Sequence, residues 1–473
     1  MTWDRKAFTP VPSQTLLIGY QQFGVGTEYE DLSQCTTNII LRFCGVAGST
    51  PDGRGYVAEP EIVQSWLEPT GRLGFDWKLD TGFTDETMVY GFLTRGYKAG
   101  GANPPGIAAP QGAFIAAAQS AVSPKVFKAE YVNALELGAK NTLLDGAMTL
   151  NVSGFYYDYS DYQISKIVDR SAANENFDAT VWGLELEAAF APTPDTLFNA
   201  AIGYLKTRVA DGEQSIDLMD RTQGGEYFQI TTIQNPNFDP STTPRDRENY
   251  VAGLIAPSDQ QFLAFDEWFV VKPSVTQASN CVAPVELAAV AGANVPGSPA
   301  DAMAAFCPGG PLLGASYASQ IVWGTPALYP GTGGILYNPA VDAPNGSAGV
   351  FADLSGHELP NAPRFTVSLG GQQTVYLPAG WDLTGRVDWY WQDQSFHRIY
   401  NTEYDRLKSW SSTNLSVWVN KADWDLKIEA YVKNLFNDTP ITGAFLNSDD
   451  TALTTNVFTL DPRLFGVSIT KRF

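Results

Sequence analysis

The stretch WDLKIEAYVKNLF, residues 424–436, alternates apolar and polar side chains with a period of two. The apolar positions are Leu426, Ile428, Ala430 and Val432, and the polar positions are Asp425, Lys427, Glu429, Tyr431 and Lys433. Successive side chains of a β-strand point to opposite faces, so this period predicts a strand. One face of that strand is apolar, and the other carries most of the charge.

The chain closes on a run of the same kind, DPRLFGVSITKRF (461–473). Phe465, Val467, Ile469 and Phe473 share one face with Lys471, whose long side chain can reach polar surroundings near the strand end. A terminal strand left alone would expose unpaired backbone amides. We therefore expect a neighbouring strand to pair with it.

Strand-like runs follow one another from about residue 68 to the end of the chain. There are eleven: 71–79, 87–97, 126–140, 147–167, 180–190, 196–209, 362–377, 381–396, 409–419, 424–436 and the terminal run from 462. The breaks between them are alternately short and long. The short breaks are 80–86, 141–146, 191–195, 378–380 and 420–423, and the long or irregular ones are 98–125, 168–179, 210–361, 397–408 and 437–461.

This sorting of breaks by length favours a transmembrane antiparallel β-barrel, which has short turns at one rim and long loops at the other. Most of the runs also reach the about 9–11 residues that a tilted strand needs to cross the hydrocarbon. Clusters of aromatic residues near strand ends, such as Trp389, Tyr390 and Trp391, suit the girdles at the two membrane boundaries. These aromatics could also fill the core of a soluble sandwich, but a sandwich gives no reason for the alternation of loop lengths.

The composition agrees with strands and turns rather than helices. The 473 residues include 43 Gly, 21 Tyr, 26 Phe and 12 Trp, but only 5 Met and 2 His. No run approaches the roughly 20 apolar residues of a transmembrane helix, which excludes helical spanning. The formal net charge of −21 argues against a nucleic-acid partner, because such partners require a positive surface.

The four cysteines form two local pairs, Cys35 with Cys44 and Cys281 with Cys307, in loop-like sequence. We expect two disulfides formed in an oxidising compartment. Four free thiols in a cytosolic protein remain the alternative, whereas zinc is disfavoured because no CxxC spacing is present. The residues that follow Met1 lack the apolar segment of an export signal, which needs an explanation.

No catalytic motif accompanies the two histidines, His357 and His397. A nucleophile elbow, a phosphate loop and HExxH are all missing, so we expect no enzyme activity, no cofactor and no metal site. The GTGG segment at 331–334 lacks the Lys-Ser/Thr of a phosphate loop.

Four segments resemble the C-terminal part of the β-barrel of TonB-dependent outer-membrane receptors. They are MVYGFLTRGYKAGGANPPG (88–106), YVNALELGAKNTLLDGAMTLNVSGFYYDYSDYQIS (131–165), VWGLELEAAFAPTPDTLFNAAIGYL (181–205) and VKNLFNDTP (432–440). Phe473 is similar to the terminal aromatic that the outer-membrane insertion machinery reads in this family. Each motif is weak alone, but their order along residues 68–473 follows that of the family.

The resemblance implies a barrel of about 22 strands with a plugged lumen. Eleven strands would be its C-terminal half, spanning residues 68–473, with 210–361 as a long extracellular loop. Because the last strand descends to the periplasm, the strand at 71–79 also descends, and we expect residues 1–67 to form an extracellular loop region. The plug, the N-terminal half of the barrel and the signal peptide would then be missing, through a truncated gene or a two-chain receptor.

The function implied is TonB-powered uptake of a scarce ligand, such as a ferric siderophore, vitamin B12 or an oligosaccharide. The expected location is the outer membrane of a Gram-negative bacterium. Expected partners are outer-membrane lipid, the small-molecule ligand, the missing barrel half and plug and, through that missing part, the TonB complex. A passive porin-like channel and a soluble secreted β-protein are the alternatives. Lumen-side candidates for ligand binding at the outer strand ends are Arg95, Tyr97, Lys98, Arg398 and Tyr400.

Overall fold

The computed structural model describes residues 2–8, 61–103, 124–168, 171–221, 223, 344–447 and 453–471, and the backbone of four short strands between residues 268 and 337. These four strands form two small ladders: β12 (Trp268–Val271) pairs with β13 (Cys281–Pro284), and β14 (Ala327–Leu328) pairs with β15 (Leu336–Tyr337).

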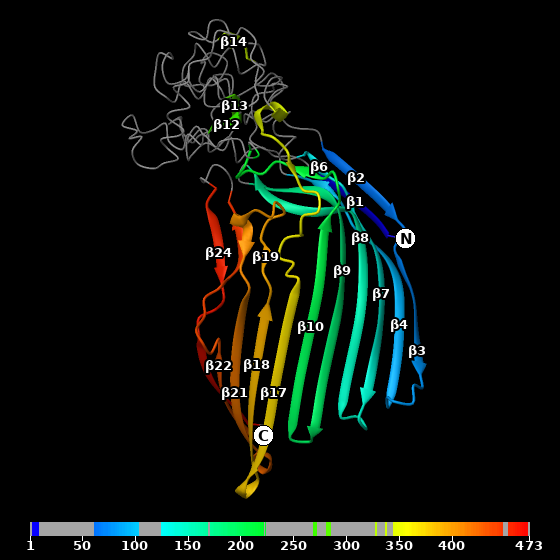
Figure 1. Ribbon diagram of the computed structural model, residues 1–473, viewed down its shortest axis with the longest axis vertical. Helices are drawn as coiled ribbons and strands as arrows, with labels where there is room; N and C mark the ends of the chain where they lie inside the picture. Colours follow the sequence, from blue (N-terminus) through cyan, green and yellow to red (C-terminus); the bar gives the residue numbers. More distant parts are fainter. Residues whose placement is uncertain are drawn as a thin grey trace, which may run out of the picture.

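One antiparallel sheet of eleven strands dominates the described residues. Its members are β3 (Gly71–Leu79), β4 (Glu86–Lys98), β7 (Glu130–Leu143), β8 (Met148–Val168), β9 (Ser171–Thr193), β10 (Thr196–Val209), β17 (Phe365–Leu377), β18 (Trp381–Gln392), β21 (Trp410–Lys421), β22 (Leu426–Lys433) and β25 (Leu464–Lys471). Each strand pairs with its neighbours in this chain order, and the strands stand side by side as a curved wall (Figure 1). The eleven strands expected from the sequence are confirmed, as a partial barrel.

Short turns join the strands at one end of the wall, called here the turn end. The turn between β7 and β8 passes through Leu144, Asp145 and Gly146, at φ of 59°, 54° and 85°. Glycine adopts such left-handed backbone without a steric penalty, which suits Gly146 to the tightest of these positions. The long connections lie at the opposite end, called here the loop end.

The loop end carries several small antiparallel ladders. They are β1 (Thr2–Phe8) with β2 (Ile62–Glu68), β5 (Gly101–Ala102) with β6 (Val126–Phe127), β11 (Gln214–Ser215) with β16 (Ala352–Asp353), β19 (Ser395–Phe396) with β20 (Arg406–Leu407), and β23 (Ile441–Leu446) with β24 (Thr455–Thr459). Four 3₁₀ segments complete the described structure: η3 (Pro344–Ser347), η4 (Pro378–Gly380), η5 (Glu403–Asp405) and η6 (Ala422–Trp424). Among the described residues, no helix is long and apolar enough to cross a membrane.

The expectation of a long or irregular break at 168–179 was wrong. Strand β8 continues to Val168 and β9 begins at Ser171, with Val168 opposite Ser171 in the ladder. A register shift between Tyr159 and Tyr162, with Asp161 at φ 56°, bends the pair without ending it. The extension persists because Phe177 and Ala179 of β9 are buried in a hydrophobic cluster at the loop end.

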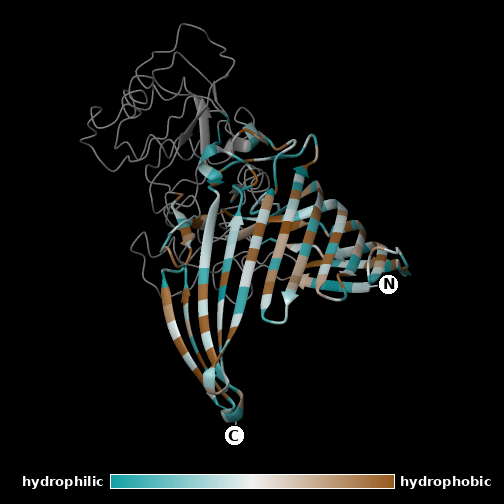
Figure 2. Ribbon diagram, turned by 60° about the horizontal axis from the view of Figure 1, so that its bottom comes forward, coloured by the Kyte–Doolittle hydropathy of each residue, from teal (hydrophilic) through white to brown (hydrophobic). Residues whose placement is uncertain are grey.

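The register sorts side chains onto two faces across all eleven strands. The apolar face runs from Leu73 through Leu93, Leu135 and Tyr156 to Trp182 in one row, and from Val387 through Leu415 and Val432 to Phe465 in another. The opposite face, called the polar face, holds the charged residues Asp76, Lys78, Glu136, Lys140, Glu185, Glu187, Arg386, Asp388, Lys427 and Glu429. Figure 2 shows the alternation along each strand.

No second layer covers the apolar face in the part of the chain that the structure describes. Leu73 is 76% exposed, and Phe465 and Val467 are each 72% exposed. The buried clusters lie at the loop end instead, around Phe177, Val209, Leu354 and Ile399. A soluble sandwich would instead bury its apolar rows between two sheets.

Candidate functional site

An acidic group of side chains lies on the polar face between β7 and β9. Tyr90 donates a hydrogen bond to Glu136 Oε1 at 2.9 Å. Its ring lies over Gly138, where a Cβ atom would come within 2.6 Å of the ring carbons. In the next strands of the same row stand Ser153 and Glu185. Glycine at 138 therefore lets the tyrosine lie flat against the wall beside these carboxylates.

Glu136, Glu185 and Glu187, called here the acidic wall patch, differ from the paired charges of the polar face. Arg386 donates to both carboxylate oxygens of Asp388, at 2.9 and 2.5 Å, and Lys427 donates to Glu429 at 2.8 Å. Among the described residues, no ion pair engages Glu185 or Glu187, and both side chains are exposed. Lys140 lies in the same row as Glu187, so the three carboxylates present a net excess of negative charge to whatever faces this wall.

A buried ion-pair network holds the loop end together. The guanidinium of Arg398 donates to Asp217 Oδ1 at 2.5 Å and to Asp405 Oδ1 at 2.5 Å. The side chains of Asp217 and Asp405 are 2% and 0% exposed, and that of Arg398 is 11% exposed. Asp217 follows β10, whereas Arg398 and Asp405 follow β18, so the network ties two long connections to one another.

A second set of buried polar contacts joins these connections to the hairpin of β8 and β9. Tyr400 donates to the backbone oxygen of Ile216 at 2.8 Å and lies 2.9 Å from Ser215 Oγ. Ser215 donates to Glu175 at 2.8 Å, and Lys166 pairs with the same carboxylate at 2.7 Å. Burial raises the pKa of Tyr400 well above its usual value, and the nearby Glu175 carboxylate adds to the effect.

His397 is the buried titratable base of the network. Its Nε2 lies 3.5 Å from Asp405 Oδ1, and its Nδ1 is buried without a hydrogen-bond partner. Burial lowers the pKa of His397, while the Asp405 carboxylate raises it and Arg398 lowers it further, and the lowering prevails. The imidazole is therefore held in its neutral form.

The five predicted ligand-binding residues fall into three different surroundings. Arg95 and Tyr97 lie on the face that carries Leu93 and Leu135, which differs from the lumen side expected for them, and Lys98 lies on the polar face. Arg398 and Tyr400 are held in the buried network and offer little free surface. A ligand-binding role for each of these residues stays a prediction.

The remaining predicted residues lie largely beyond the structural description. Cys35, Cys44, Cys307 and Phe473 are outside the described residues, and Cys281 is described only as the first residue of β13. Both disulfides and the insertion signal therefore remain predictions. In the described part of the chain, no group of three or more His, Cys, Asp and Glu side chains is arranged to hold a metal ion.

The sequence missed most of the buried network. Asp217, Glu175 and Lys166 lie in stretches expected to be a loop or an ordinary strand, and nothing local marks a charge that will be buried. Glu185 and Glu187 were quoted within a motif, but their lack of ion-pairing partners is visible only in the sheet. A search of the predicted strands for charged residues could have found these two glutamates. It would select those with no residue of opposite charge two positions away or directly across on a neighbouring strand.

Part of the chain matches a model of a known protein family. Residues 46–253 match the family model described as TonB dependent receptor-like, beta-barrel. Among curated protein sequences, none is significantly similar to this chain.

Solved structures that resemble the chain include three receptors of low sequence identity. The ferric yersiniabactin uptake receptor FyuA from Yersinia pestis has 13% identity and a TM-score of 0.46, with 89% of this chain and 40% of that chain covered. The siderophore receptor PiuA from Acinetobacter baumannii has 12% identity and a TM-score of 0.42, with 89% and 37% covered. The ferric preacinetobactin receptor BauA from the same species has 12% identity and a TM-score of 0.41, with 87% and 37% covered.

This chain thus spans at most 40% of the length of those three chains. The match over residues 46–253 and the sheet of eleven antiparallel strands lead to one conclusion: the matched part of the chain is similar to the β-barrel of TonB-dependent receptors.

Proposed function

We propose that this chain is one part of the wall of an outer-membrane receptor that takes up a scarce ligand with energy supplied through TonB. The observation that carries the proposal is the face of mostly apolar side chains that continues across all eleven strands, set against a charged opposite face. Hydrocarbon on one side and water on the other is the environment that stabilises such a wall.

The wall needs partner strands to become a barrel. In the described sheet, β3 and β25 each pair on one edge alone, and an unpaired edge within lipid is costly. Because the number of antiparallel strands is odd, β3 and β25 run in the same direction. Antiparallel closure therefore requires an odd number of further strands, whose two outermost members both run the opposite way. The rest of the same receptor is the partner that we propose.

The acidic wall patch gives the inner side a docking surface. Glu185 and Glu187 are exposed and without ion pairs in the described residues, so a basic segment that enters the lumen would gain charge-assisted hydrogen bonds there. We propose that the plug of the receptor supplies this segment. Residues 1–67 and 210–361 would lie at the outer mouth. There the buried network around Arg398 would hold in place the connections that contact the ligand.

Ferric siderophores, vitamin B12 and oligosaccharides are the ligand classes that the family suggests, and a metal-chelate ligand is the first to test. Growth under iron limitation, with and without an intact copy of the gene, tests that choice. Equal growth of the two strains in iron-poor medium would redirect the search to other ligands.

Site-directed labelling tests the membrane placement directly. Nitroxide labels at Leu415→Cys and Ser416→Cys sit on neighbouring positions but on opposite faces of β21. In the assembled receptor, we expect the label at 415 to be accessible to oxygen from lipid and the label at 416 to a water-soluble nickel complex. Equal accessibility of both labels to the nickel complex would refute a lipid-facing wall.

The chain by itself provides a second test. Expressed alone in outer membranes, it should give no heat-modifiable, protease-resistant band, because both sheet edges lack partners. Co-expression with the rest of the barrel should restore that band. A resistant closed form from this chain alone would show that it needs no further strands.

A further inference from the structure

The outer part of the β8–β9 hairpin forms a strap at the loop end. The strap, defined as residues 162–168 and 171–177, is the part of this ladder beyond the register shift at Asp161. Figure 1 shows that the outer ends of β8 and β9 turn aside there. At about 3.3 Å per residue, a strand of this length reaches about 23 Å, or about five spacings between neighbouring strands.

The tip of the strap packs against connections from distant parts of the chain. Val168 and Ala173 are 4% and 1% exposed. They form a buried cluster with Ile216 and Ala348, which belong to the connection between β10 and β17. Leu453, from the connection between β23 and β24, packs against the same cluster. Since β22, which precedes β23, is the fifth strand beyond β9 in the sheet, the reach of the strap accounts for this contact.

One face of the strap is held by buried charge. Lys166 and Glu175 form an ion pair at 2.7 Å, and each side chain is 14% exposed. Lys166 also donates to Ser215 Oγ at 3.1 Å, and Ser215 donates to Glu175 at 2.8 Å. Ser215 lies 2.9 Å from the hydroxyl of Tyr400, so this face reaches the β10–β17 and the β18–β21 connections. Separation of the strap from either connection would remove partners from a buried ion pair, which is costly.

The opposite face of the strap bonds to a third connection, which joins β4 to β7. Gln163 and Asn176 are paired in the ladder, and the period of two places them on the face opposite Lys166. Gln163 donates to the backbone oxygens of Ala99 and Lys128, at 3.1 and 3.0 Å. Asn176 donates to the backbone oxygen of Lys128 at 3.1 Å and accepts from its amide at 2.7 Å.

Asn103 completes the contact between this third connection and the strap. Its side chain donates to the backbone oxygens of Pro124 and Asn174, at 2.7 and 2.9 Å, and accepts from the amide of Asn174 at 2.7 Å. Asn103 is 2% exposed. A buried amide costs free energy when its hydrogen bonds are broken, so the third connection is also held to the strap.

The strap therefore lies between connections that share it as a common support. We propose that the strap and the three connections open as one cooperative unit, called here the cap, instead of as three independent loops. Besides the strap, the described residues of the cap are 99–103, 124–129, 210–221, 344–364 and 393–409. This inference rests on the proposed function, which places the cap at the outer mouth. A ligand that passes this part of the mouth would then displace all three connections together.

Hydrogen exchange in the assembled receptor tests the proposal with two variants that act on opposite faces of the strap, Lys166→Met and Asn103→Ala. One reporter is the amide of Asn103, which donates to Lys125 at 3.0 Å, and the other is that of Leu354, which donates to Glu213 at 2.9 Å. In a cooperative unit, amides on both sides share one opening equilibrium. We expect each variant to lower the protection factors of both reporters at least ten-fold and by similar factors. If each variant affects only the reporter on its own side, the connections open independently and the proposal fails.

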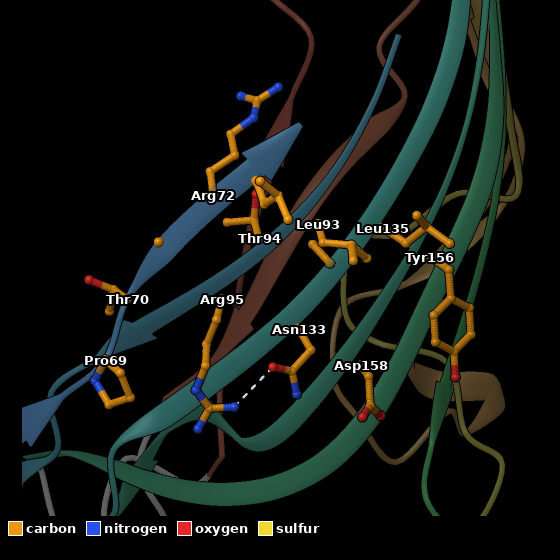
Figure 3. Close-up of a pocket in the computed structure, with 13 residues that line it drawn as sticks. Pro69, Thr70, Arg72, Leu93, Thr94, Arg95, Asn133, Leu135, Tyr156 and Asp158 are labelled. Atoms are coloured by element: carbon orange, nitrogen blue, oxygen red, sulfur yellow. Dashed lines mark hydrogen bonds between the residues drawn. The ribbon is translucent and has the colours of Figure 1, made fainter. Parts of the chain in front are cut away.

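Arg95→Gln is the control for a polar substitution outside the cap. Arg95 donates to Asn133 at 2.9 Å in exposed surroundings, beside a hollow on the apolar face (Figure 3). Both reporters should keep their wild-type protection in this variant. The amide of Thr374, which donates to Asp195 at 2.8 Å at the turn end, should keep its protection in all variants. An equal fall at Thr374 would mean that the whole wall loosens, and would overturn the assignment of a separate unit at the loop end.

Heat-modifiable mobility and membrane fractionation distinguish failure of the cap from failure of the proposed function. If Lys166→Met does not assemble, Ser215→Ala takes its place, because it removes a smaller group from the same face. Normal assembly with independent exchange on the two sides would refute the cap and leave the proposed function intact. If the wild type never fractionates with the outer membrane, both fail.

Discussion

Replacement of Arg398 by methionine should raise the fraction of molecules in which the loop end of the wall is locally unfolded. The substitution keeps most of the side-chain volume but leaves Asp217 and Asp405, whose side chains are 2% and 0% exposed, without their shared cation. Breaking a buried ion pair by the removal of one partner destabilises a protein by about 3–5 kcal/mol. At about 1.4 kcal/mol for each factor of ten, the opening equilibrium should rise by roughly 10²–10⁴.

Hydrogen exchange at the backbone amides of this connection measures that equilibrium. The amide of His397 donates to the backbone oxygen of Asp405 at 2.9 Å, and the amide of Asp405 donates to Thr402 at 2.9 Å, so both report on local opening. In the assembled receptor with Arg398→Met, both amides should exchange at least about a hundred-fold faster than in the wild type, which is the lower bound of the ion-pair effect.

Arg364→Gln is the matched control. Arg364 also pairs with a carboxylate, that of Glu358, but its side chain is 59% exposed. An exposed pair contributes only about 0–1 kcal/mol, so exchange at the same amides should change less than about ten-fold. Similar exchange rates in the two variants would show that burial of the Arg398 network adds nothing, and the reasoning would fail.

Three further predictions concern other parts of the wall. Because burial lowers the folded-state pKa of His397, the unfolded state binds more protons than the folded state. The loop should be fully stable above about pH 6.5, and the protection factors of its amides should fall as the pH falls below it, whereas His397→Asn should lack this dependence. Gly138→Ala forces a Cβ against Tyr90 and should cost about 1–3 kcal/mol, seen as a lower urea midpoint of the heat-modifiable form, while Gly385→Ala, with nothing within 4 Å, should leave that midpoint unchanged. Neutralising the acidic wall patch with Glu185→Gln and Glu187→Gln should weaken retention of a separately expressed plug at least ten-fold in a pull-down; unchanged retention contradicts the docking role.

The number of strands in the wall could be predicted from the sequence because it is a local property. Period two, as in residues 424–436, is set by backbone geometry alone. The alternation of short and long breaks then gave the antiparallel order, since each short break closes a hairpin. The strand ends were harder to place: β8 and β9 run through the expected loop at 168–179, because buried contacts of Phe177 and Ala179 extend them.

The candidate site was less accessible to such reasoning. Arg95 and Lys98 seemed equivalent as basic residues at a strand end, yet the register puts them on opposite faces. Arg398 and Tyr400 were expected to be available to ligand, and the fold buries both against residues about 180 positions earlier in the chain. The type of a side chain determines which hydrogen bonds and ion pairs it can form. Long-range packing decides which of them are already formed within the protein and which are left for a ligand.

Sequence alone therefore determined the wall: eleven strands, their order, and the division of side chains into an apolar and a charged set. These features follow from a two-residue period and from loop length, both of which act between neighbours in the chain. The tertiary structure alone decided which charges are neutralised, which tyrosine is buried and where a hollow opens on the apolar face. Each of these depends on contacts between segments far apart in sequence, and no local pattern encodes the desolvation that such contacts impose.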